Sequence, residues 1–450
     1  MKKYDAIIIG FGKGGKTLAA DMAKRGFSIA IIEQSKEMYG GTCINIGCIP
    51  TKFLVNKGIK NSKSNLYEEN DKKYKEYIKE KNNFIKALRN KNYEMLNMYE
   101  NVDIYNGIGS FINNEIIEIK TETETIQIKG EKIFINTGAK NIIPVIKGIE
   151  NNNYVYDSKS IMELEKLPKN LVIIGGGYIG LEFAQIYRNF GSKVTILEGA
   201  SSFMPREERE IADEIKEILE NEEISIKLGI KIEKLENNKI IYKEKEEVKE
   251  IKADAILIAV GRKPNIDKLK LENTDIELGE KKEIKVDEKL HTSVSNIWAI
   301  GDVHGGLQFT YTSLDDYRII RSELFENGSY TLKDRKIVPY TVFLTPQFSK
   351  VGLTEKEAIE QGYKIKIAKM APITPKMKII DSTKGILKTV VDANTNKILG
   401  ASLLMEDSAE IINTIAITMK CDKEYYFLKD NIFTHPTVSE ILNDLFGLIK

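Results

Sequence analysis

The chain has 450 residues, 42% of them hydrophobic and 30% charged, so it is long enough for about three domains with substantial cores. Its 67 Lys and Arg residues almost cancel its 66 Asp and Glu residues, which gives no support for nucleic acid or an anionic membrane as a partner. No apolar run approaches the roughly 20 residues of a membrane span, and the apolar stretch near Met1 runs straight into a glycine loop, so we expect a cytoplasmic protein.

The N-terminal region has the pattern of a βαβ unit that binds a dinucleotide. A buried parallel strand is expected over residues 6–9, then a helix to Lys24, then a second strand over residues 29–33. The turn after the first strand carries the glycines of a GxGxxG motif: Gly10, Gly12 and Gly15. Such a turn brings a pyrophosphate to the helix N-terminus, and Glu33 at the end of the second strand can accept hydrogen bonds from an adenosine ribose.

Two of the three cysteines, Cys43 and Cys48, follow this unit within the segment 40–52. Pro50 is typical of a first helical turn, which places Cys48 at a helix N-terminus, where the dipole favours a thiolate by up to about 2 kcal/mol. Full ionisation of Cys48 requires a second partner, such as a bound cofactor or a cation. A zinc site would need two more ligands at suitable spacing, and a structural disulfide is uncommon without an export signal. We interpret the pair as a redox-active dithiol.

The βαβ pattern then recurs. Residues 55–100 are expected to form paired surface helices, and residues 133–139 a strand that ends in a tight turn. The second unit has a strand over residues 171–174, a helix, and a strand that ends at Glu198. Its glycines are Gly175, Gly177 and Gly180. The first glycine precedes the acid by 23 residues in both units (10 to 33, 175 to 198), so two dinucleotide sites are predicted.

Glu198 bears on the choice of nicotinamide coenzyme. A 2′-phosphate beside its carboxylate would be repelled, and no arginine adjoins it in the sequence. The second site is therefore expected to prefer NADH to NADPH.

The rest of the chain returns to the first module and then changes character. Residues 255–262 resemble the counterpart, in the second module, of the earlier strand over 133–139. Residues 297–302 form a strand that delivers Asp302 to its carboxyl end, where such sheets bind ligands. The first domain is thus expected to be split, with the second inserted. Beyond residue 333, alternating segments predict an antiparallel sheet followed by helices over 410–420 and from 438.

A histidine in a proline turn lies near the C-terminus. A lone histidine is more often structural than catalytic, but His435 is followed by Pro436 and, five residues later, by Glu440. For His435, the structural and the catalytic interpretation are about equally supported.

Together, these motifs resemble the class I pyridine nucleotide–disulfide oxidoreductases over the whole chain. This family includes lipoamide dehydrogenase, glutathione reductase and mercuric reductase. Segments such as 305–311 and 313–318 are similar to a bacterial branch of reactive-chlorine-resistance flavoproteins known as NADH-dependent copper(II) reductases. The resemblance implies an α/β fold with two Rossmann-like domains and a C-terminal α+β dimerisation domain. The implied bounds are 1–145 with 262–332 for FAD, 146–261 for NAD and 333–450 for the dimer interface.

The resemblance also implies roles for individual residues. Cys48 would be the flavin-proximal thiol and Cys43 the outer thiol, with both able to hold copper transiently. Lys52 would approach the flavin and pair with Glu182. His435 and Glu440, supplied by the other subunit, would manage the proton on Cys43. The residues implied to contact FAD or NADH are Gly10, Gly12, Gly15, Glu33, Gly41, Thr42, Lys52, Gly109, Thr137, Gly138, Gly301, Asp302, Gly175, Gly177, Tyr178, Gly180, Glu198, Gly261 and Arg262.

The function implied is reduction of Cu(II) to Cu(I) by NADH in a homodimer, in defence against hypochlorous acid. The sequence itself encodes no acceptor, so dihydrolipoyl dehydrogenase and another disulfide or mercuric reductase stay open. A flavin-bearing redox sensor, or a docked subunit of a larger complex, is the non-enzymatic alternative.

Overall fold

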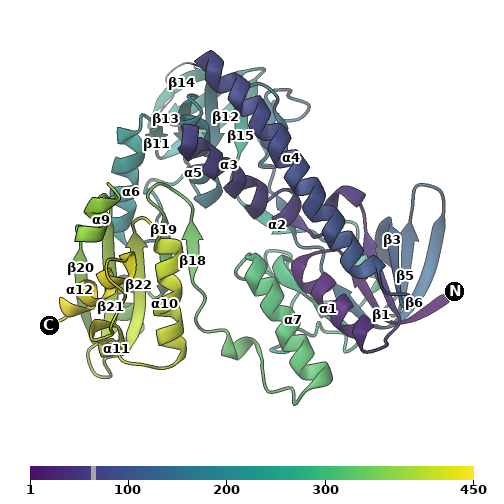
Figure 1. The fold of residues 1–450 in the computed structure, drawn as a ribbon. Coiled ribbons are helices and arrows are strands. Elements are labelled where there is room, and N and C mark those ends of the chain that lie inside the picture. The colour runs from purple at the N-terminus through teal and green to yellow at the C-terminus, as the bar shows by residue number, and fades with distance from the viewer. Residues whose placement is uncertain (62–66) are drawn as a thin grey trace.

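The protein is described here from a computed structural model that covers residues 1–61 and 67–450. Figure 1 shows three regions that follow the chain: an N-terminal sheet with its helices, a central sheet region, and a C-terminal sheet region. Parallel and antiparallel sheets combined with helices give the α/β architecture that the sequence predicted.

The N-terminal sheet is the first dinucleotide-binding module. Its strand order is β3-β2-β1-β6-β5-β4, and β17 pairs with β6 in parallel. Short, nearly continuous apolar runs form its central strands, because a strand whose two faces are both covered has no side chains that face solvent. The strands are β1 (Lys2–Ile9), β2 (Ile29–Glu33), β3 (Val102–Asn106), β4 (Ile108–Phe111), β5 (Ile116–Lys120), β6 (Thr125–Ile135) and β17 (Ile297–Ala299). Strand β17 returns from far along the chain, as expected for a split module.

Two helices cover one face of this sheet. Helix α1 (Lys13–Lys24) follows the glycine turn and packs beside α7 (Thr310–Phe325). The predicted helix to Lys24 and the predicted strand over residues 29–33 are confirmed.

The second module has the strand order β11-β10-β9-β15-β8, all in parallel. Its elements are β8 (Val155–Tyr156), β9 (Asn170–Ile174), α5 (Tyr178–Asn189), β10 (Lys193–Leu197), α6 (Arg209–Asn221), β11 (Ser225–Lys227) and β15 (Ala255–Ile258). An antiparallel sheet extends it with β12 (Ile230–Glu236), β13 (Lys239–Glu244) and β14 (Glu247–Lys252). Between the modules, β7 (Ala139–Asn141) pairs antiparallel with β16 (Arg262–Pro264), so the outgoing and returning segments lie side by side.

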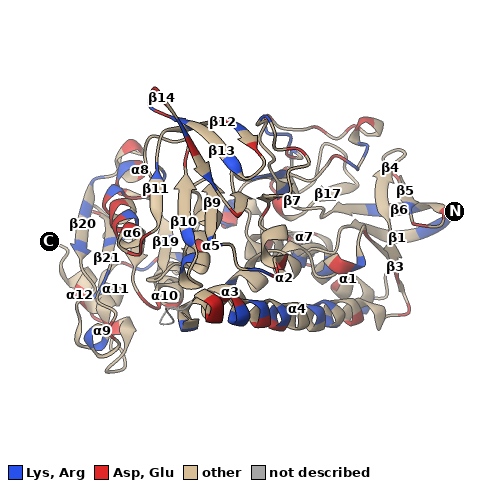
Figure 2. Cartoon of the chain, turned by 90° about the horizontal axis from the view of Figure 1, so that it is seen from above, with Lys and Arg blue, Asp and Glu red and all other residues tan. Residues whose placement is uncertain are grey.

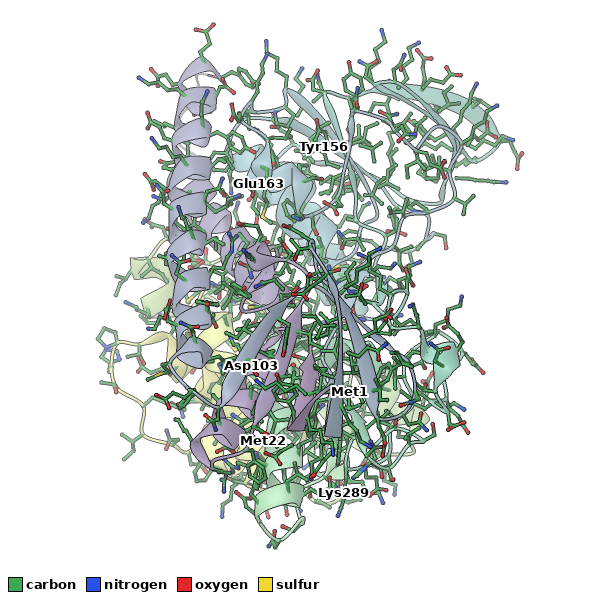
Figure 3. All side chains as sticks on the ribbon, turned by 90° about the vertical axis from the view of Figure 1, so that its right-hand side faces the viewer. Met1, Met22, Asp103, Tyr156, Glu163 and Lys289 are labelled. Atoms are coloured by element: carbon green, nitrogen blue, oxygen red, sulfur yellow. The ribbon has the colours of Figure 1, made fainter. Side chains whose placement is uncertain are left out.

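The predicted surface helices are α3 (Cys48–Asn61) and the 31-residue α4 (Tyr67–Asn97). Helix α4 runs along the edge of the molecule past both modules, and its outer side carries closely spaced charges of both signs (Figure 2). Near its middle, the buried ammonium of Lys81 lies 2.7 Å from the carboxylate of Glu163, and Figure 3 shows Glu163 beside this helix. The helix therefore ties the two modules together.

The C-terminal region is an antiparallel sheet with the order β18-β19-β22-β21-β20. Its strands are β18 (Tyr340–Val342), β19 (Phe348–Gly352), β20 (Ile365–Met370), β21 (Ile386–Asp392) and β22 (Ile398–Leu404). The helices are α8 (Glu355–Glu360), α9 (Pro375–Ile379), α10 (Ser408–Lys420), α11 (Tyr426–Lys429) and α12 (Ile441–Gly447). The antiparallel sheet and the two late helices agree with the sequence, whereas the exact domain bounds stay a prediction.

One apolar cluster is shared by all three regions. It contains Tyr74 of α4, Tyr187 of α5 and Phe348 of β19, each at most 1% exposed. The contact between the tyrosines is also polar, since their hydroxyls lie 3.0 Å apart. This shared core fixes the modules around the cavity described next.

Candidate active site

A cavity of about 2400 Å³ lies where the modules meet. It is lined by the glycine loops after β1 and β9, by the cysteine segment, by the turn after β17 and by β18. Parallel α/β sheets bind ligands at the carboxyl ends of their strands, and both glycine loops occupy that position.

The first glycine loop leaves room for a ligand by packing tightly against the protein behind it. Gly10 has φ +106°, and a Cβ there would lie 2.3 Å from the carbonyl oxygen of Asn136. Asn136, which the sequence analysis did not single out, accepts the N–H of Gly15 at 3.0 Å through its side chain. Glu33 accepts the N–H of Phe11 at 3.1 Å, and burial raises the pKa of this glutamate to about 7.

The second glycine loop follows the same plan. Gly175 has φ +110°, and a Cβ there would meet the carbonyl oxygen of Ala259 at 2.5 Å. Glu198 accepts the N–H of Gly176 at 2.5 Å. Arg206 lines the same cavity, a cation that the sequence analysis did not consider because it lies eight positions beyond Glu198.

Several features fit a flat dinucleotide in this cavity. A Cβ at Gly138 or Gly177 would meet no heavy atom within 4 Å, so the backbone is bare where it faces the open space. Within the described residues, the buried hydroxyl oxygen of Thr137 has no hydrogen-bond partner. Burial raises the pKa of Asp302, partly offset by the charge of Arg262. A ligand with hydroxyl and phosphate groups would satisfy these atoms.

The two cysteines lie on adjacent helical segments and face the cavity as free thiols. Cys43 is in α2 (Thr42–Asn45), and Cys48 begins α3, as predicted. A hydrogen bond from the Cys48 thiol lowers the pKa of Cys43 to about 6, and the same bond together with burial raises the pKa of Cys48. The hydrogen bond between the sulfurs thus favours the thiolate on Cys43, and the predicted Cys48 thiolate requires a further partner, such as a bound cofactor. The first proton lost belongs to the pair as a whole.

Two residues near the thiols were not assigned a role from the sequence. The hydroxyl of Thr310, the first residue of α7, lies 3.9 Å from Sγ of Cys48 and also helps to lower the pKa of Cys43. Tyr311 lines the cavity beside it and donates to the carbonyl of Pro339 at 2.7 Å. Both lie in the segment 305–311, which carried the resemblance but no individual role.

Two lysines, Lys52 and Lys16, lie near the thiol pair. Nζ of Lys52 lies 2.6 Å from the carboxylate of Glu182, which confirms the expected contact. Lys16 of α1 is 4% exposed, and its ammonium donates to the side chain of Asn92. Burial lowers the pKa of Lys16 to about 8, and the charge of Cys43 acts in the opposite direction. Both lysines favour a thiolate on Cys43.

His435 and Glu440 do not line this chain's cavity. Nδ1 of His435 lies 2.9 Å from Oε1 of Glu440, and the histidine side chain is 73% exposed. The hydrogen bond lowers the pKa of Glu440, after the larger effect of the Thr437 N–H. The pair is thus preformed and accessible to a second subunit.

The remaining predicted site residues divide into two groups. Those that line the cavity are Gly10, Gly12, Glu33, Gly41, Thr42, Lys52, Gly109, Thr137, Gly138, Gly175, Gly177, Tyr178, Glu182, Glu198, Gly261, Arg262 and Asp302. Gly15, Gly180 and Gly301 lie behind the loops, where a Cβ would come within 2.9 Å of neighbouring atoms. Close packing of the backbone, rather than contact with a ligand, thus accounts for the requirement for glycine at these three positions.

Two kinds of feature are absent from residues 1–61 and 67–450. No helix there combines the length and apolar character that a membrane crossing requires. The same residues contain no cluster of three or more His, Cys, Asp or Glu side chains suited to hold a metal ion.

Two family models match the chain. The model described as pyridine nucleotide-disulphide oxidoreductase matches residues 4–316, and the dimerisation domain of the same family matches residues 338–446.

Individual relatives agree with this match. The chain is 48% identical to the probable pyridine nucleotide-disulfide oxidoreductase RclA of Escherichia coli, over the full length of both. It is 31% identical to a mercuric reductase of Bacillus cereus, covering 97% of this chain and 70% of the relative. It is 30% identical to a dihydrolipoyl dehydrogenase of Bacillus subtilis, covering 98% and 97%.

A solved structure is also similar throughout. The Cu(II) complex of the HOCl-induced flavoprotein disulfide reductase RclA from Escherichia coli superposes with a TM-score of 0.94 at 47% identity, covering 100% of both chains. This chain is therefore an enzyme of the pyridine nucleotide-disulphide oxidoreductase family.

Proposed function

We propose that the protein is an FAD-dependent NADH oxidoreductase whose Cys43–Cys48 pair passes electrons to Cu(II). The observation that carries this proposal is that both glycine loops and both thiols open into one cavity. A dinucleotide bound on each loop would therefore extend through the same cavity toward the cysteines.

We place one cofactor on each loop. FAD would lie along Gly10, Gly12, Thr42 and Asp302, and NADH would lie along Gly175 and the other residues of the second loop. Bound flavin would supply the chemistry that takes a hydride from NADH and passes an electron pair to the cysteine disulfide. The glutamates at the strand ends would orient each ribose.

The chain's own residues control protons and charge at the thiols. Lys52 presents a cation toward the pair, and its contact with Glu182 limits the cost of burying either charge. Thr310 offers a hydroxyl at 3.9 Å from Cys48. His435, held by Glu440 and supplied by the second subunit of a homodimer, would exchange a proton with Cys43.

Copper is the acceptor we favour. NADH yields two electrons and a proton as it becomes NAD⁺, which balances the reduction of two Cu(II) ions to Cu(I). Thiolates reduce Cu(II) and are good ligands for Cu(I), and Cys43 has a pKa of about 6, so its thiolate forms at neutral pH. The structure of the similar RclA as a Cu(II) complex supports this choice, as does its induction by HOCl, which points to a role against reactive chlorine.

Further aspects of the proposal rest on the family. The dimerisation domain supports a homodimer. We also propose the domain bounds 1–145 with 262–332, 146–261 and 333–450, and action in the cytoplasm, where a free dithiol is kept reduced. The 30% identity to a dihydrolipoyl dehydrogenase over nearly the whole chain makes lipoamide the second candidate acceptor.

An anaerobic acceptor screen tests the function. Purified, FAD-loaded protein with NADH is given Cu(II) and a Cu(I) chelator, or lipoamide, oxidised glutathione or Hg(II). We expect Cu(I) formation in proportion to NADH consumed, at a rate above the disulfide acceptors, and its loss in Cys43→Ser and Cys48→Ser. Rapid lipoamide turnover with negligible Cu(I) would assign the protein to the dihydrolipoyl dehydrogenases. A single slow reduction with no turnover would favour a redox sensor.

A further inference from the structure

Helix α1 carries a buried cation that has no acidic partner. Lys16 is 4% exposed, and its ammonium donates a hydrogen bond to the neutral side chain of Asn92. Among residues 1–61 and 67–450, the one negative charge that acts on this ammonium is that of Cys43, while the charge of Lys13 repels it. A buried charge is costly unless it is paired, so the ammonium of Lys16 is best stabilised when Cys43 is a thiolate.

A role in forming helix α1 does not explain this charge. The N-terminus of a helix carries a partial positive charge, so cations in the first turn are unfavourable. The first turn of α1 nevertheless contains Lys13 and Lys16 and no acidic residue. The corresponding helix of the second module, α5, has no charged residue in its first turn. A buried cation is therefore not part of the plan that the two glycine loops share.

The packing of the cysteine loop on α1 sets the position of Lys16. Gly41 is so close to the start of α1 that a Cβ there would lie 2.8 Å from Cα of Gly12. One helical turn later, the N–H of Lys16 donates to the carbonyl of Gly12 at 3.0 Å, which places both residues on one face of the helix. Asn92 of α4 approaches the same loop, because a Cβ at Gly40 would lie 3.1 Å from its Cγ. Figure 1 shows α4 passing α1 and α2. The ammonium is thus held between α1, α4 and the loop that leads into the thiols.

We propose that Lys16 is a positioning residue whose ammonium stabilises the reduced, anionic form of the Cys43–Cys48 pair and so raises the reduction potential of the pair. The inference rests on the proposed function, in which this pair is redox-active and receives electrons from NADH through the flavin. Reduction takes two electrons and one proton: the S–S bond breaks, one sulfur takes the proton, and the other stays a thiolate. When two Cu(II) ions each accept one electron, the S–S bond forms again and the proton leaves. Because only the reduced form carries the negative charge, a fixed cation beside it favours reduction.

This cation also bears on the choice of acceptor. A pair that is easier to reduce gives up its electrons less readily. The loss matters for an acceptor whose reduction potential is close to that of the pair, such as another disulfide. It matters little for Cu(II), which thiolates reduce spontaneously. Lys16 therefore favours copper over a disulfide as the acceptor.

The equilibrium between dithiol and disulfide tests this inference. FAD-loaded protein in a Cys421→Ser background is equilibrated anaerobically with dithiothreitol redox buffers, and the Cys43–Cys48 disulfide is quantified by alkylation and mass spectrometry. The buffer is held at pH 7, because burial lowers the pKa of Lys16 to about 8 and the ammonium is still charged there. In Lys16→Met, we expect the equilibrium constant for reduction to fall about tenfold, which is about 30 mV for a two-electron couple. Lys24→Met is the matched control, since this lysine is exposed in the last turn of the same helix.

Thermal unfolding of the two redox states supplies the second readout. If the charge of Lys16 acts on the thiolate, Lys16→Met should destabilise the reduced protein relative to the oxidised protein, because redox state and folding are thermodynamically linked. A lysine with a purely structural role would lower the melting temperature of both forms equally.

An unchanged reduction equilibrium in Lys16→Met overturns the inference. If that variant does not fold, Asn92→Asp takes its place: a carboxylate beside the ammonium offsets its charge at the thiols, so the same fall is expected, and its absence overturns the inference. A wild-type pair that does not interconvert between dithiol and disulfide would instead refute the proposed function.

Discussion

Nζ of Lys52 lies 2.6 Å from Oε2 of Glu182, although the two residues are 130 positions apart and belong to different modules. The N–H of Phe343 donates to the other oxygen of the same carboxylate at 2.9 Å. One glutamate of the second module therefore receives a cation from the thiol helix and a backbone donor from the C-terminal region. The orientation of Lys52 toward the thiols depends on all three regions.

Removing the cation from this contact should destabilise the protein. Lys52→Met leaves the carboxylate of Glu182, 8% exposed, with one backbone donor. We expect a loss of about 2 kcal/mol in the free energy of unfolding, less than the ~3–5 kcal/mol of a fully buried pair, because the Lys52 side chain is 31% exposed. Lys129→Met, which breaks an exposed pair with Glu115, should cost at most about 1 kcal/mol. Urea denaturation measures both, and equal losses would contradict the argument.

The thiol pair should ionise below the usual range for cysteine. Because a thiolate exists above its pKa, alkylation of Cys43 in the reduced protein should rise through pH 6 rather than near 8.5. Cys48→Ser removes the sulfur that contributes most to this shift, so the midpoint should move upward. The measurement is iodoacetamide labelling followed by mass spectrometry, in a Cys421→Ser background so that only the pair reacts. A midpoint that stays at pH 6 in Cys48→Ser would show that the charges of the lysines, rather than the Cys48 thiol, lower the pKa of Cys43.

Absorption spectra should distinguish the roles of the two cysteines. With FAD bound, Cys43→Ser leaves Cys48 as the only thiol of the pair and should show a long-wavelength charge-transfer band. Cys48→Ser should lack this band, because its remaining sulfur is the one predicted to face the acceptor. Identical spectra for the two variants would refute the assignment of Cys48 to the flavin side.

Coenzyme preference should depend on Glu198. We expect the wild type to prefer NADH in kcat/KM, and Glu198→Arg to narrow that preference by reversing the charge that repels a 2′-phosphate. Arg206 lines the same cavity, so Arg206→Ala should lower NADPH use more than NADH use. Steady-state kinetics with both coenzymes provides the comparison. A wild type that favours NADPH would indicate that Arg206 outweighs Glu198.

His435 should serve the thiols of the other subunit. A heterodimer of one Cys43→Ser chain and one His435→Ala chain should recover one competent site, or about half the wild-type turnover per dimer. Tandem-tag purification secures the heterodimer, and each homodimeric variant is the control. Copper reduction needs less proton transfer than disulfide exchange, so recovery is best measured with a disulfide acceptor. Absence of recovery would indicate either that the site is made within one chain or that His435 is structural.

The sequence predicted local features well, whereas several contacts between distant residues at the site were missed. The glycine turns, the helix that begins at Cys48 and the antiparallel C-terminal sheet all follow from local patterns, and the structure confirms them. Asn136 was missed because its contact with Gly15 spans 121 residues and lies outside any motif. Thr310 was missed for the same reason, since 262 positions separate it from Cys48.

Ionisation was the least predictable property. The sequence places Cys48 at a helix N-terminus, and this position alone favours a Cys48 thiolate. The order of proton loss depends instead on the hydrogen bond between the two sulfurs and on nearby cations, including the buried Lys16. Sequence spacing contains neither the distance between the thiols nor the burial of a lysine from another helix.

Because the apolar cluster that contains Tyr74, Tyr187 and Phe348 spans the three regions, we expect these regions to unfold together. A fragment that contains only one of the three regions would expose to solvent side chains that are at most 1% exposed in the whole chain. Because these side chains are buried between regions, unfolding of one region would expose apolar surface of its neighbours and so destabilise them. Calorimetry of the intact chain should therefore show a single endotherm, and the inserted module expressed alone should be insoluble. Although the sequence divides into recognisable modules, we therefore expect the whole chain to fold and unfold as one cooperative unit.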